Sequence, residues 1–259
     1  MISPPTRKSP SPLAFTIIAV LIGVHVLAWQ GTGFSPGALV EGWRGMVDFL
    51  DQSFPPDLSV LGESLEAAVI TLYIGLLGTT FSIPFALILG ILAARVTTPN
   101  AWTYQIARSI LSVLRSIPDV VFALIFVTAV GLGPFAGVLA LAFHNTGVMG
   151  KLWAEAMEET DPGPREALKV AGANGTQIAA NAVLPAVLPQ MVGLLLYRFD
   201  VNVRSSLVLG LVGAGGIGFL INQSIKLFRF DQMVTHIIVV VIVVVIVDQI
   251  SAYVRRRLA

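Results

Sequence analysis

The sequence of 259 residues contains no cysteine, only three histidines and few charged residues. The absence of cysteine excludes disulfide bonds and thiolate metal sites. His25, His144 and His236 lie too far apart in the sequence for a local zinc motif such as H-E-x-x-H. Charged residues make up 12% of the chain, which is about half of the fraction typical of a soluble domain. Lipid is therefore predicted to contact much of the surface.

The sequence also lacks the motifs of nucleotide hydrolysis and of zinc-dependent hydrolases. No G-x-x-x-x-G-K-[ST] phosphate loop occurs, so any ATP hydrolysis must come from another subunit. H-E-x-x-H is absent, and no enzyme activity, metal or cofactor is expected of this chain. The formal net charge is only +1, which provides no strong positive field for binding nucleic acid.

Long apolar segments dominate what the sequence does contain. Hydrophobic residues make up 55% of the chain and the mean hydropathy is +0.83. The valine- and isoleucine-rich run at 237–247 would favour a strand in water, but in lipid the backbone groups must pair within the segment, so a helix is predicted. The fold class is thus an all-α integral membrane protein with about six transmembrane helices. They are predicted at residues 13–29, 65–93, 106–130, 134–151, 183–206 and 233–253.

Polar segments and basic residues predict the organisation and orientation of these helices. Residues 1–64 are interpreted as an N-terminal tail, a first membrane helix and an external loop, with a short amphipathic helix over 38–52. Residues 65–259 form the core, in which 154–182 is a cytoplasmic loop. Ten of the sixteen basic residues fall in segments on the side of the N-terminus, and three fall on the other side. The positive-inside rule therefore predicts that both termini are cytoplasmic.

The stretch LVLGLVGAGGIG at 207–218 contains the spacing G-x-G-x-x-G in Gly213, Gly215 and Gly218. A dinucleotide site needs this motif between a strand and a helix of a parallel sheet. The residues around it predict membrane helices instead. The glycines are therefore interpreted as contacts that let helices approach closely, together with a bend in the chain.

The segment DPGPREALKVAGANGTQIAANAVLPAVLP at 161–189 predicts a short helix, a sharp turn and a second helix. Asp161 can cap a helix that starts at Pro162 or Pro164, and Gly172 is a typical terminator. Asn174 or Thr176 can start the second helix, which is predicted to run to Pro185. An exposed helix pair of this kind suits insertion into a groove on another protein.

Part of this segment resembles a known signature. Glu166-Ala167, Gly172 and Leu184-Pro185 are similar to the EAA pattern, E-A-A-x3-G-x9-I-x-L-P, of permease subunits in ABC importers. Leu168 and Ala182 depart from the pattern. The resemblance implies the type I ABC importer permease fold. It also implies that the loop docks into a cleft of the ATP-hydrolysing subunit and transmits its closure, with Glu166, Ala167, Gly172, Leu184 and Pro185 as the coupling residues.

The flanking segments look like the phosphonate branch of these permeases. They are GLGPFAGVLAL (131–141), HNTGVMGKL (144–152), LYRFDVNVRS (196–205) and VGAGGIG (212–218). Membership of this branch implies a multi-pass protein of the bacterial inner membrane that forms a homodimer. The expected partners are an ATPase dimer, which holds ATP and magnesium, and an external substrate-binding protein.

Ionisable residues inside predicted spans are functional candidates because they are costly in lipid. Arg115 with Asp119, and Asp200 with Arg204, are spaced to form ion pairs on one helix face. Arg198 lies about 200° around the helix from Asp200, so it is expected to lack that partner. It would either hold an anionic substrate transiently or pack between subunits. The candidates for the translocation path are Arg198, Asp200, Arg204, His144 and Asn145, of which the last two are otherwise interpreted as a buried hydrogen-bonding pair.

These features predict the permease subunit of an ATP-driven importer for phosphonate or a related phosphorus oxyanion such as phosphite or phosphate. Alternating access would be driven by the separate ATPase through the EAA-like loop. The alternative is an ATP-independent secondary transporter of small anions, in which Asp200 would be the only plausible carboxylate for a coupling ion. The sequence does not distinguish between the phosphorus oxyanions.

Overall fold

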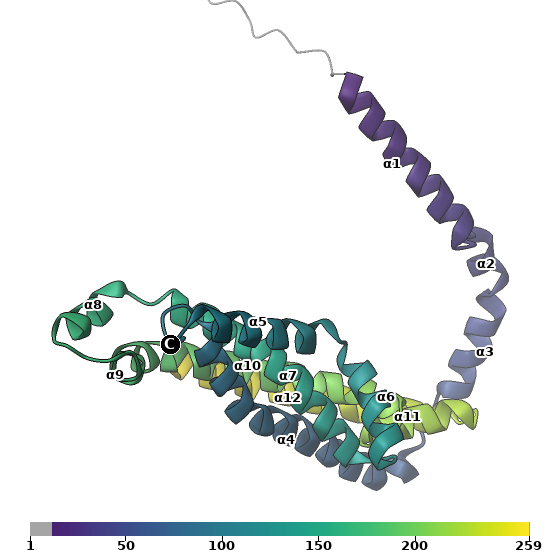
Figure 1. Ribbon diagram of the computed structural model, residues 1–259. Helices are drawn as coiled ribbons and strands as arrows, with labels where there is room; N and C mark the ends of the chain where they lie inside the picture. The colour runs from purple at the N-terminus through teal and green to yellow at the C-terminus, as the bar shows by residue number, and fades with distance from the viewer. Residues whose placement is uncertain (1–11, 259) are drawn as a thin grey trace, which may run out of the picture. The chain divides into compact units, whose positions relative to one another are not determined.

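The computed structural model describes residues 12–258, with side chains for 12–254. Within this range every regular element is a helix, which confirms the all-α class (Figure 1). Arg7 and Lys8, and the side chains of Arg255, Arg256 and Arg257, lie outside this description. The elements are α1 Pro12–Gly31, α2 Pro36–Glu41, α3 Trp43–Ser53, η1 Leu58–Val60, α4 Leu61–Ala93, α5 Ala101–Ser116, α6 Asp119–Val130, α7 Pro134–Glu158, α8 Pro162–Val170, α9 Gly175–Ile178, η2 Ala179–Val183, α10 Leu184–Leu211, α11 Ile217–Lys226 and α12 Phe230–Leu258.

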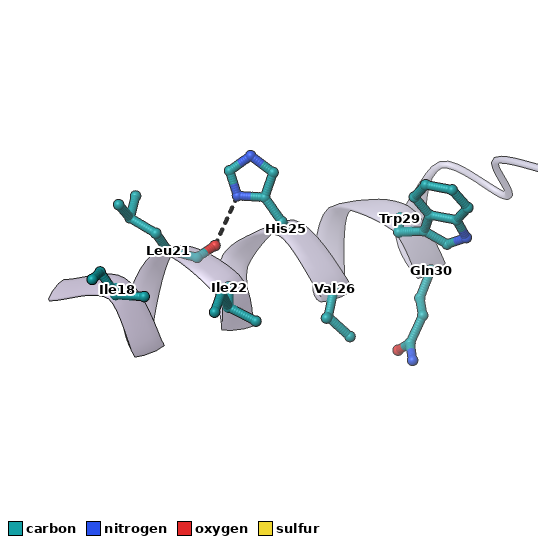
Figure 2. Close-up of a pocket in the computed structure, with 7 residues that line it drawn as sticks. All are labelled: Ile18, Leu21, Ile22, His25, Val26, Trp29 and Gln30. Atoms are coloured by element: carbon teal, nitrogen blue, oxygen red, sulfur yellow. Dashed lines mark hydrogen bonds between the residues drawn. The ribbon is translucent and has the colours of Figure 1, made fainter. Parts of the chain in front are cut away.

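The chain divides into two compact units, Met1–Asp51 and Gln52–Ala259. In the first unit, α1 is a helix of 20 residues with no buried residue, and it is long and apolar enough to cross a membrane. Figure 2 shows one face of it, where Nδ1 of His25 donates a hydrogen bond to the carbonyl oxygen of Leu21 at 2.8 Å. This local bond satisfies one ring nitrogen without any other element.

Hydrogen bonds at the start of the second unit explain why it begins near residue 52, whereas the sequence placed the core from residue 65. The backbone carbonyl of Asp57 accepts a bond from Oγ1 of Thr235 at 2.8 Å, and its carboxylate accepts one from Nε2 of Gln232 at 3.1 Å. Oγ of Ser64 and Nδ1 of His236 form a hydrogen bond at 2.7 Å, and both residues are buried. Hydrogen bonds from Ser59 and then from Gln232 lower the pKa of Asp57. The segment before α4 is thereby fixed to the start of α12.

Helices α4 and α7 pack along each other at the centre of the second unit, because glycines replace larger side chains at their contacts (Figure 1). A Cβ at Gly78 would be 2.5 Å from Cβ of Leu141, and one at Gly90 would be 3.1 Å from the carbonyl oxygen of Gly150. Small residues at such positions let membrane helices approach closely.

Within residues 12–258, four helical segments are long and apolar enough to cross a membrane, and a bent pair adds a fifth if it counts as one span. The fourth predicted span, 134–151, lies in α7 and is not among them. His144 and Asn145 lower the hydropathy of its middle, and 15 of its 25 residues are buried by protein. A helix enclosed by its neighbours does not need an apolar surface toward lipid.

The span predicted over 106–130 is not one continuous helix. The structure places α5 and α6 there, with an angle of 85° between them at Ile117 and Pro118. Ile117 is extended (φ −86°, ψ 120°), as expected for a residue before proline. The predicted Arg115–Asp119 pair is wrong for the same reason, since the bend removes the shared helix face. The Asp119 carboxylate instead accepts a hydrogen bond from the N–H of Val120 at 2.9 Å.

The glycine-rich stretch forms a tight turn between α10 and α11. Gly213, Gly215 and Gly216 have φ values of 95°, 79° and 72°, which L side chains rarely adopt. Gly218 packs against α10, where an added Cβ would lie 2.0 Å from the carbonyl oxygen of Leu207. The positive φ values and the close contact of Gly218 with α10 confirm the interpretation as helix contacts and a bend. In the described chain, no strand precedes the motif, as a dinucleotide site would need.

Candidate functional site

The loop between α7 and α10 forms the predicted helix pair. Oδ1 of Asp161 accepts a hydrogen bond from the N–H of Gly163 at 2.9 Å and caps α8. Gly172 ends that helix with φ +84°. Asn174 starts α9 in a capping box with Gln177, in which both side chains accept backbone N–H groups at 2.9 Å. Figure 1 shows α8 and α9 at one end of the second unit, away from α6 and α11.

The second helix does not stop at Pro185. It continues from α9 through the π-helical turn η2 into α10, and Pro185 lies in the first turn of α10. Proline fits there because the first turn does not require its missing N–H group. The loop is therefore joined directly to a membrane helix.

The face of α8 that carries Glu166 is open to a partner. Glu166, Ala167 and Gly172 are exposed, as is Pro185. An open groove of about 500 Å³ lies between α8, the start of α9 and the turn after α4. Its lining includes Val96, Pro162, Arg165, Glu166, Lys169 and Ile178. The predicted coupling residues Glu166 and Gly172 thus lie on one exposed elbow, whereas Leu184 is half-buried at the base of α10.

A second cluster fixes the point where α7 enters this loop. Oε1 of Glu158 accepts the backbone N–H of Arg95 at 2.9 Å, and Oε2 pairs with Arg108 at 2.9 Å. Arg108 also donates from Nε to the carbonyl oxygen of Ala93 at 3.1 Å. The guanidinium carbons of Arg95 and Arg108 lie 5.5 and 4.8 Å from the ring centre of Tyr104. We refer to Arg95, Tyr104, Arg108 and Glu158 as the Glu158 cluster.

The Glu158 cluster connects three helices to the groove. It joins the end of α4, the first two turns of α5 and the last residue of α7. Val96, next to Arg95, lines the groove under α8. A hydrogen bond from Arg95 to Tyr104, with the attraction of the two groups, raises the pKa of Arg95, so this guanidinium stays charged. The loop is therefore attached to α4 and α5 as well as to α7 and α10.

Polar side chains form a continuous network between α4, α7 and α10. Nε of Arg198 donates to Oδ1 of Asn145 at 2.8 Å, and Nδ2 of Asn145 donates to Oγ of Ser82 at 2.8 Å. On the other side, Nδ2 of Asn202 donates to Oγ1 of Thr79 at 2.7 Å. Asn145, Asn202, Ser82 and Thr79 are buried. Each amide and hydroxyl is paired, as buried polar groups require.

Arg198 is held in this network by neutral oxygens. Its second contact is from Nη2 to Oδ1 of Asn202 at 3.5 Å, and no carboxylate of the described residues is within ion-pair distance of it. The prediction that Asp200 does not satisfy Arg198 is confirmed. His144 and Asn145 both form hydrogen bonds inside the protein, but not to each other: Nδ1 of His144 donates to the carbonyl oxygen of Ile117 at 3.0 Å. Neighbouring residues on a helix point about 100° apart.

The predicted pair of Asp200 and Arg204 is present one turn further along α10. Asp200 is only 3% exposed, and its Oδ1 is buried without a hydrogen-bond partner. Nη2 of Arg204 also lies 3.6 Å from Oδ1 of Asp248 in α12. Arg204 is therefore the main countercharge of Asp200, and it contacts only Oδ2 of the carboxylate.

We expect the substitution Arg204→Ala to destabilise the protein by about 3 kcal/mol, because it leaves a buried carboxylate without its countercharge. The measurement is the free energy of unfolding in mixed micelles during titration with denaturing detergent. The double variant Asp200→Asn/Arg204→Gln should recover most of the loss, since no charge remains. Equal losses in the single and double variants would contradict this account of the pair.

Sequence reasoning missed the Glu158 cluster and the partners of Arg198. Asn202 follows Arg198 by four residues, so helical spacing alone could have indicated that contact. Glu158 and Arg108 are separated by 50 residues, and no local motif connects them.

Comparison with known proteins identifies the family. Residues 86–259 match the family described as the binding-protein-dependent transport system inner membrane component. The chain belongs to this family. Its members are permease subunits of ABC transporters, so the protein is a multi-pass component of the inner membrane and is not itself an enzyme. Membership implies an ATPase subunit and a substrate-binding protein as partners.

Individual relatives and a solved structure agree with the family. The phosphite transport system permease protein PtxC of Stutzerimonas stutzeri is 36% identical over 92% of this chain and 87% of its own length. HtxC, a permease protein of the same organism, is 41% identical over 93% and 86%. The phosphate-import permease protein PhnE of Mycolicibacterium smegmatis is 39% identical over 98% of this chain, which spans 48% of that relative. The inward-facing MetNI methionine ABC transporter matches with a TM-score of 0.61 at 24% identity, over 76% of this chain and 94% of that one, and shows the same type I permease fold.

Proposed function

We propose that this permease imports a phosphorus oxyanion, of the class of phosphite, phosphonate or phosphate, driven by a separate ATPase. The similarity over nearly the whole chain to the permease proteins of phosphite and phosphate import supports the substrate class. The observation that carries the coupling mechanism is the capped elbow of α8 and α9, which is exposed and continuous with α10.

The proposed orientation places this elbow and both termini in the cytoplasm, with two copies of the chain forming the permease. Five basic residues belong to the end of the second unit that bears the elbow: Arg95, Arg108, Lys151, Arg165 and Lys169. This bias is the reason for assigning that end to the cytoplasm. ATP and magnesium bind to the partner ATPase, and this chain binds no cofactor of its own.

The mechanism that we propose is alternating access. The ATPase binds the face of α8 that carries Glu166 and Ala167. Gly172 forms the turn after α8, and Leu184 and Pro185 connect the elbow to α10. Closure of the ATPase moves the elbow, and α10 follows because no flexible linker separates them. A change in the binding free energy of the elbow between the two ATPase states shifts the permease between its inward- and outward-open forms.

Arg198 and its neighbours supply the proposed contact for the anion. Because Asn145 and Asn202 hold Arg198 through neutral oxygens, its positive charge is not cancelled by a carboxylate. A guanidinium can offer two parallel N–H groups to an oxyanion. One such cation gives the path weak affinity, as conduction requires release as well as binding. His144 is a polar residue beside the path. The ion pair of Asp200 and Arg204 stabilises α10 and does not contact the anion.

The alternative of a secondary transporter is disfavoured by the same geometry. A coupling ion would need a free carboxylate near the centre of the membrane. Asp200 is the candidate, and it is already paired with Arg204.

The decisive experiment is reconstitution of the permease in liposomes with its neighbouring ATPase and binding protein. Phosphite, methylphosphonate and phosphate should stimulate ATP hydrolysis only when the binding protein is present, and the anion should accumulate inside. Accumulation without the ATPase would reject the proposal in favour of secondary transport.

We expect Glu158→Gln to reduce the number of anions imported per ATP hydrolysed. Glutamine can still accept the N–H of Arg95, but the ion pair with Arg108 is lost. A partly exposed ion pair contributes about 0.5 to 1 kcal/mol, which corresponds to a roughly two- to fivefold change in this ratio. ATP hydrolysis by the assembled complex should persist.

The matched control is Glu159→Gln, one residue later, where the side chain is exposed. It should leave the ratio unchanged. The exchange Arg108→Glu/Glu158→Arg should restore part of the coupling that Glu158→Gln loses. Equal effects at positions 158 and 159 would show that the cluster does not position the loop.

A further inference from the structure

Helix α3 of the first unit has two chemically distinct faces. With about 100° between successive residues, Trp43, Met46, Val47 and Leu50 fall within a stripe about 100° wide. Arg44, Asp48 and Asp51 fall in a separate charged stripe, which begins about 40° beyond Val47 and extends to about 140° from Trp43. Trp43, Met46 and Leu50 each expose half or more of their surface within the structure. Neither the coupling elbow nor the polar network accounts for this apolar stripe.

The neighbouring helices determine where α3 must lie. Both α1 and the segment Leu58–Ala93 are long and apolar enough to cross the membrane, and they follow one another in the chain. The connection between them therefore starts and ends at the same membrane surface. Since α3 occupies the second half of this connection, it cannot be far from the headgroups at its C-terminal end.

Aromatic residues mark the same surface at the start of the connection. Trp29, in the last turn of α1, packs edge to face on Phe34, with ring centres 4.5 Å apart. Tryptophan is enriched where membrane helices leave the hydrocarbon region, and Trp43 begins α3 a short distance further on. An amphipathic helix with a tryptophan on its apolar side and charges on a separate side has the composition of a helix that lies in the membrane interface.

We propose that α3 lies flat in the phospholipid interface, with Trp43, Met46, Val47 and Leu50 inserted among the acyl chains near the headgroups. Arg44, Asp48 and Asp51 face water. The assignment to the external leaflet rests on the proposed orientation, whereas the insertion itself does not. The helix holds the connection between α1 and α4 against the membrane.

The absence of native cysteine makes a direct test possible. Single cysteines at Trp43, Met46, Val47 and Leu50 form one set, and single cysteines at Arg44, Asp48 and Asp51 form the matched set. Each variant carries a fluorescent probe and is reconstituted as the full transporter complex in vesicles of phosphatidylethanolamine and phosphatidylglycerol. Emission is then measured with nitroxide-labelled phospholipid in the membrane or with iodide in the water.

Probes on the apolar stripe should lose most of their emission to the nitroxide lipid and little to iodide, and the matched set should show the reverse. Equal quenching by iodide on both faces would overturn the proposal, because α3 would then stand in water. Protection of the stripe from both quenchers would also overturn it, since a second copy or the binding protein would then cover the face. Protection that appears only on adding the binding protein would identify the latter.

The orientation is tested separately from the insertion. Cysteine at Asp48 should react with a membrane-impermeant maleimide from outside intact cells. Reaction only after the cells are opened would reject the external assignment and, with it, part of the proposed function. The quenching pattern would still report whether α3 lies in lipid.

Discussion

Transport should be strongly reduced by Glu166→Lys, while the protein still inserts and assembles in the membrane. Glu166 is exposed on α8 beside the groove, and it is the residue that the resemblance to the EAA pattern places against the ATPase. Reversal of a charge in a protein interface costs about 2 kcal/mol or more, which corresponds to a roughly thirtyfold loss of coupled activity. The measurement is anion uptake and stimulated ATP hydrolysis in liposomes with equal amounts of complex.

The control for this variant is Glu159→Lys, which makes the same charge change outside α8 on another exposed residue. It should retain most of the uptake. Thermal stability of the isolated permease should be unchanged in both variants, because neither glutamate is buried. Normal uptake by Glu166→Lys would contradict the assignment of α8 as the coupling surface. Equal loss of uptake in Glu166→Lys and Glu159→Lys would show that the effect comes from the change in net charge.

Local chemistry made the helix pair of α8 and α9 predictable from the sequence. Asp161, Gly172 and Asn174 act within a few residues of their own position, through caps and a left-handed turn. Such features depend on backbone geometry rather than on the rest of the fold. Hydropathy likewise predicted most of the membrane helices, because lipid imposes the same requirement on every span.

The errors occurred where hydropathy alone could not show local geometry. Two apolar stretches on either side of Ile117 and Pro118 together have the length of one span, yet proline and the residue before it do not favour a continuous helix. A rule based on proline would have divided this span and would also have removed the pairing of Arg115 with Asp119. The physical signal was present, but the apolar composition outweighed it.

The contact of Arg198 with Asn145 could not be derived from the sequence. Asn145 is 53 residues away, and its contact depends on the rotation and register of α7 against α10. Glycines of α4 contribute to this arrangement, since Gly78 allows close contact with Leu141 of α7 and Gly75 with Val203 of α10. Tertiary packing therefore decides which polar residues of the membrane region meet.

The glycine stretch at 207–218 gives the prediction with the largest effect on folding. In Gly218→Ala, the new methyl group would lie 2.0 Å from the carbonyl oxygen of Leu207 and 3.1 Å from Cα of Gly210. These are backbone atoms, so α10 and α11 must separate. Overpacking of this kind costs about 3 kcal/mol or more. We expect little folded protein after extraction in mild detergent, judged by gel filtration and by thermal melting.

Gly193→Ala is the matched substitution within α10, because nothing lies within 4 Å of the new Cβ. Alanine favours helix over glycine by up to about 1 kcal/mol, so this variant should melt at the same temperature or slightly higher. The contrast separates close packing from helix propensity, since both variants make the same chemical change. If Gly218→Ala melts like Gly193→Ala, the close approach of α10 and α11 is not what the glycines provide. The motif that resembles a dinucleotide fingerprint would then need another explanation.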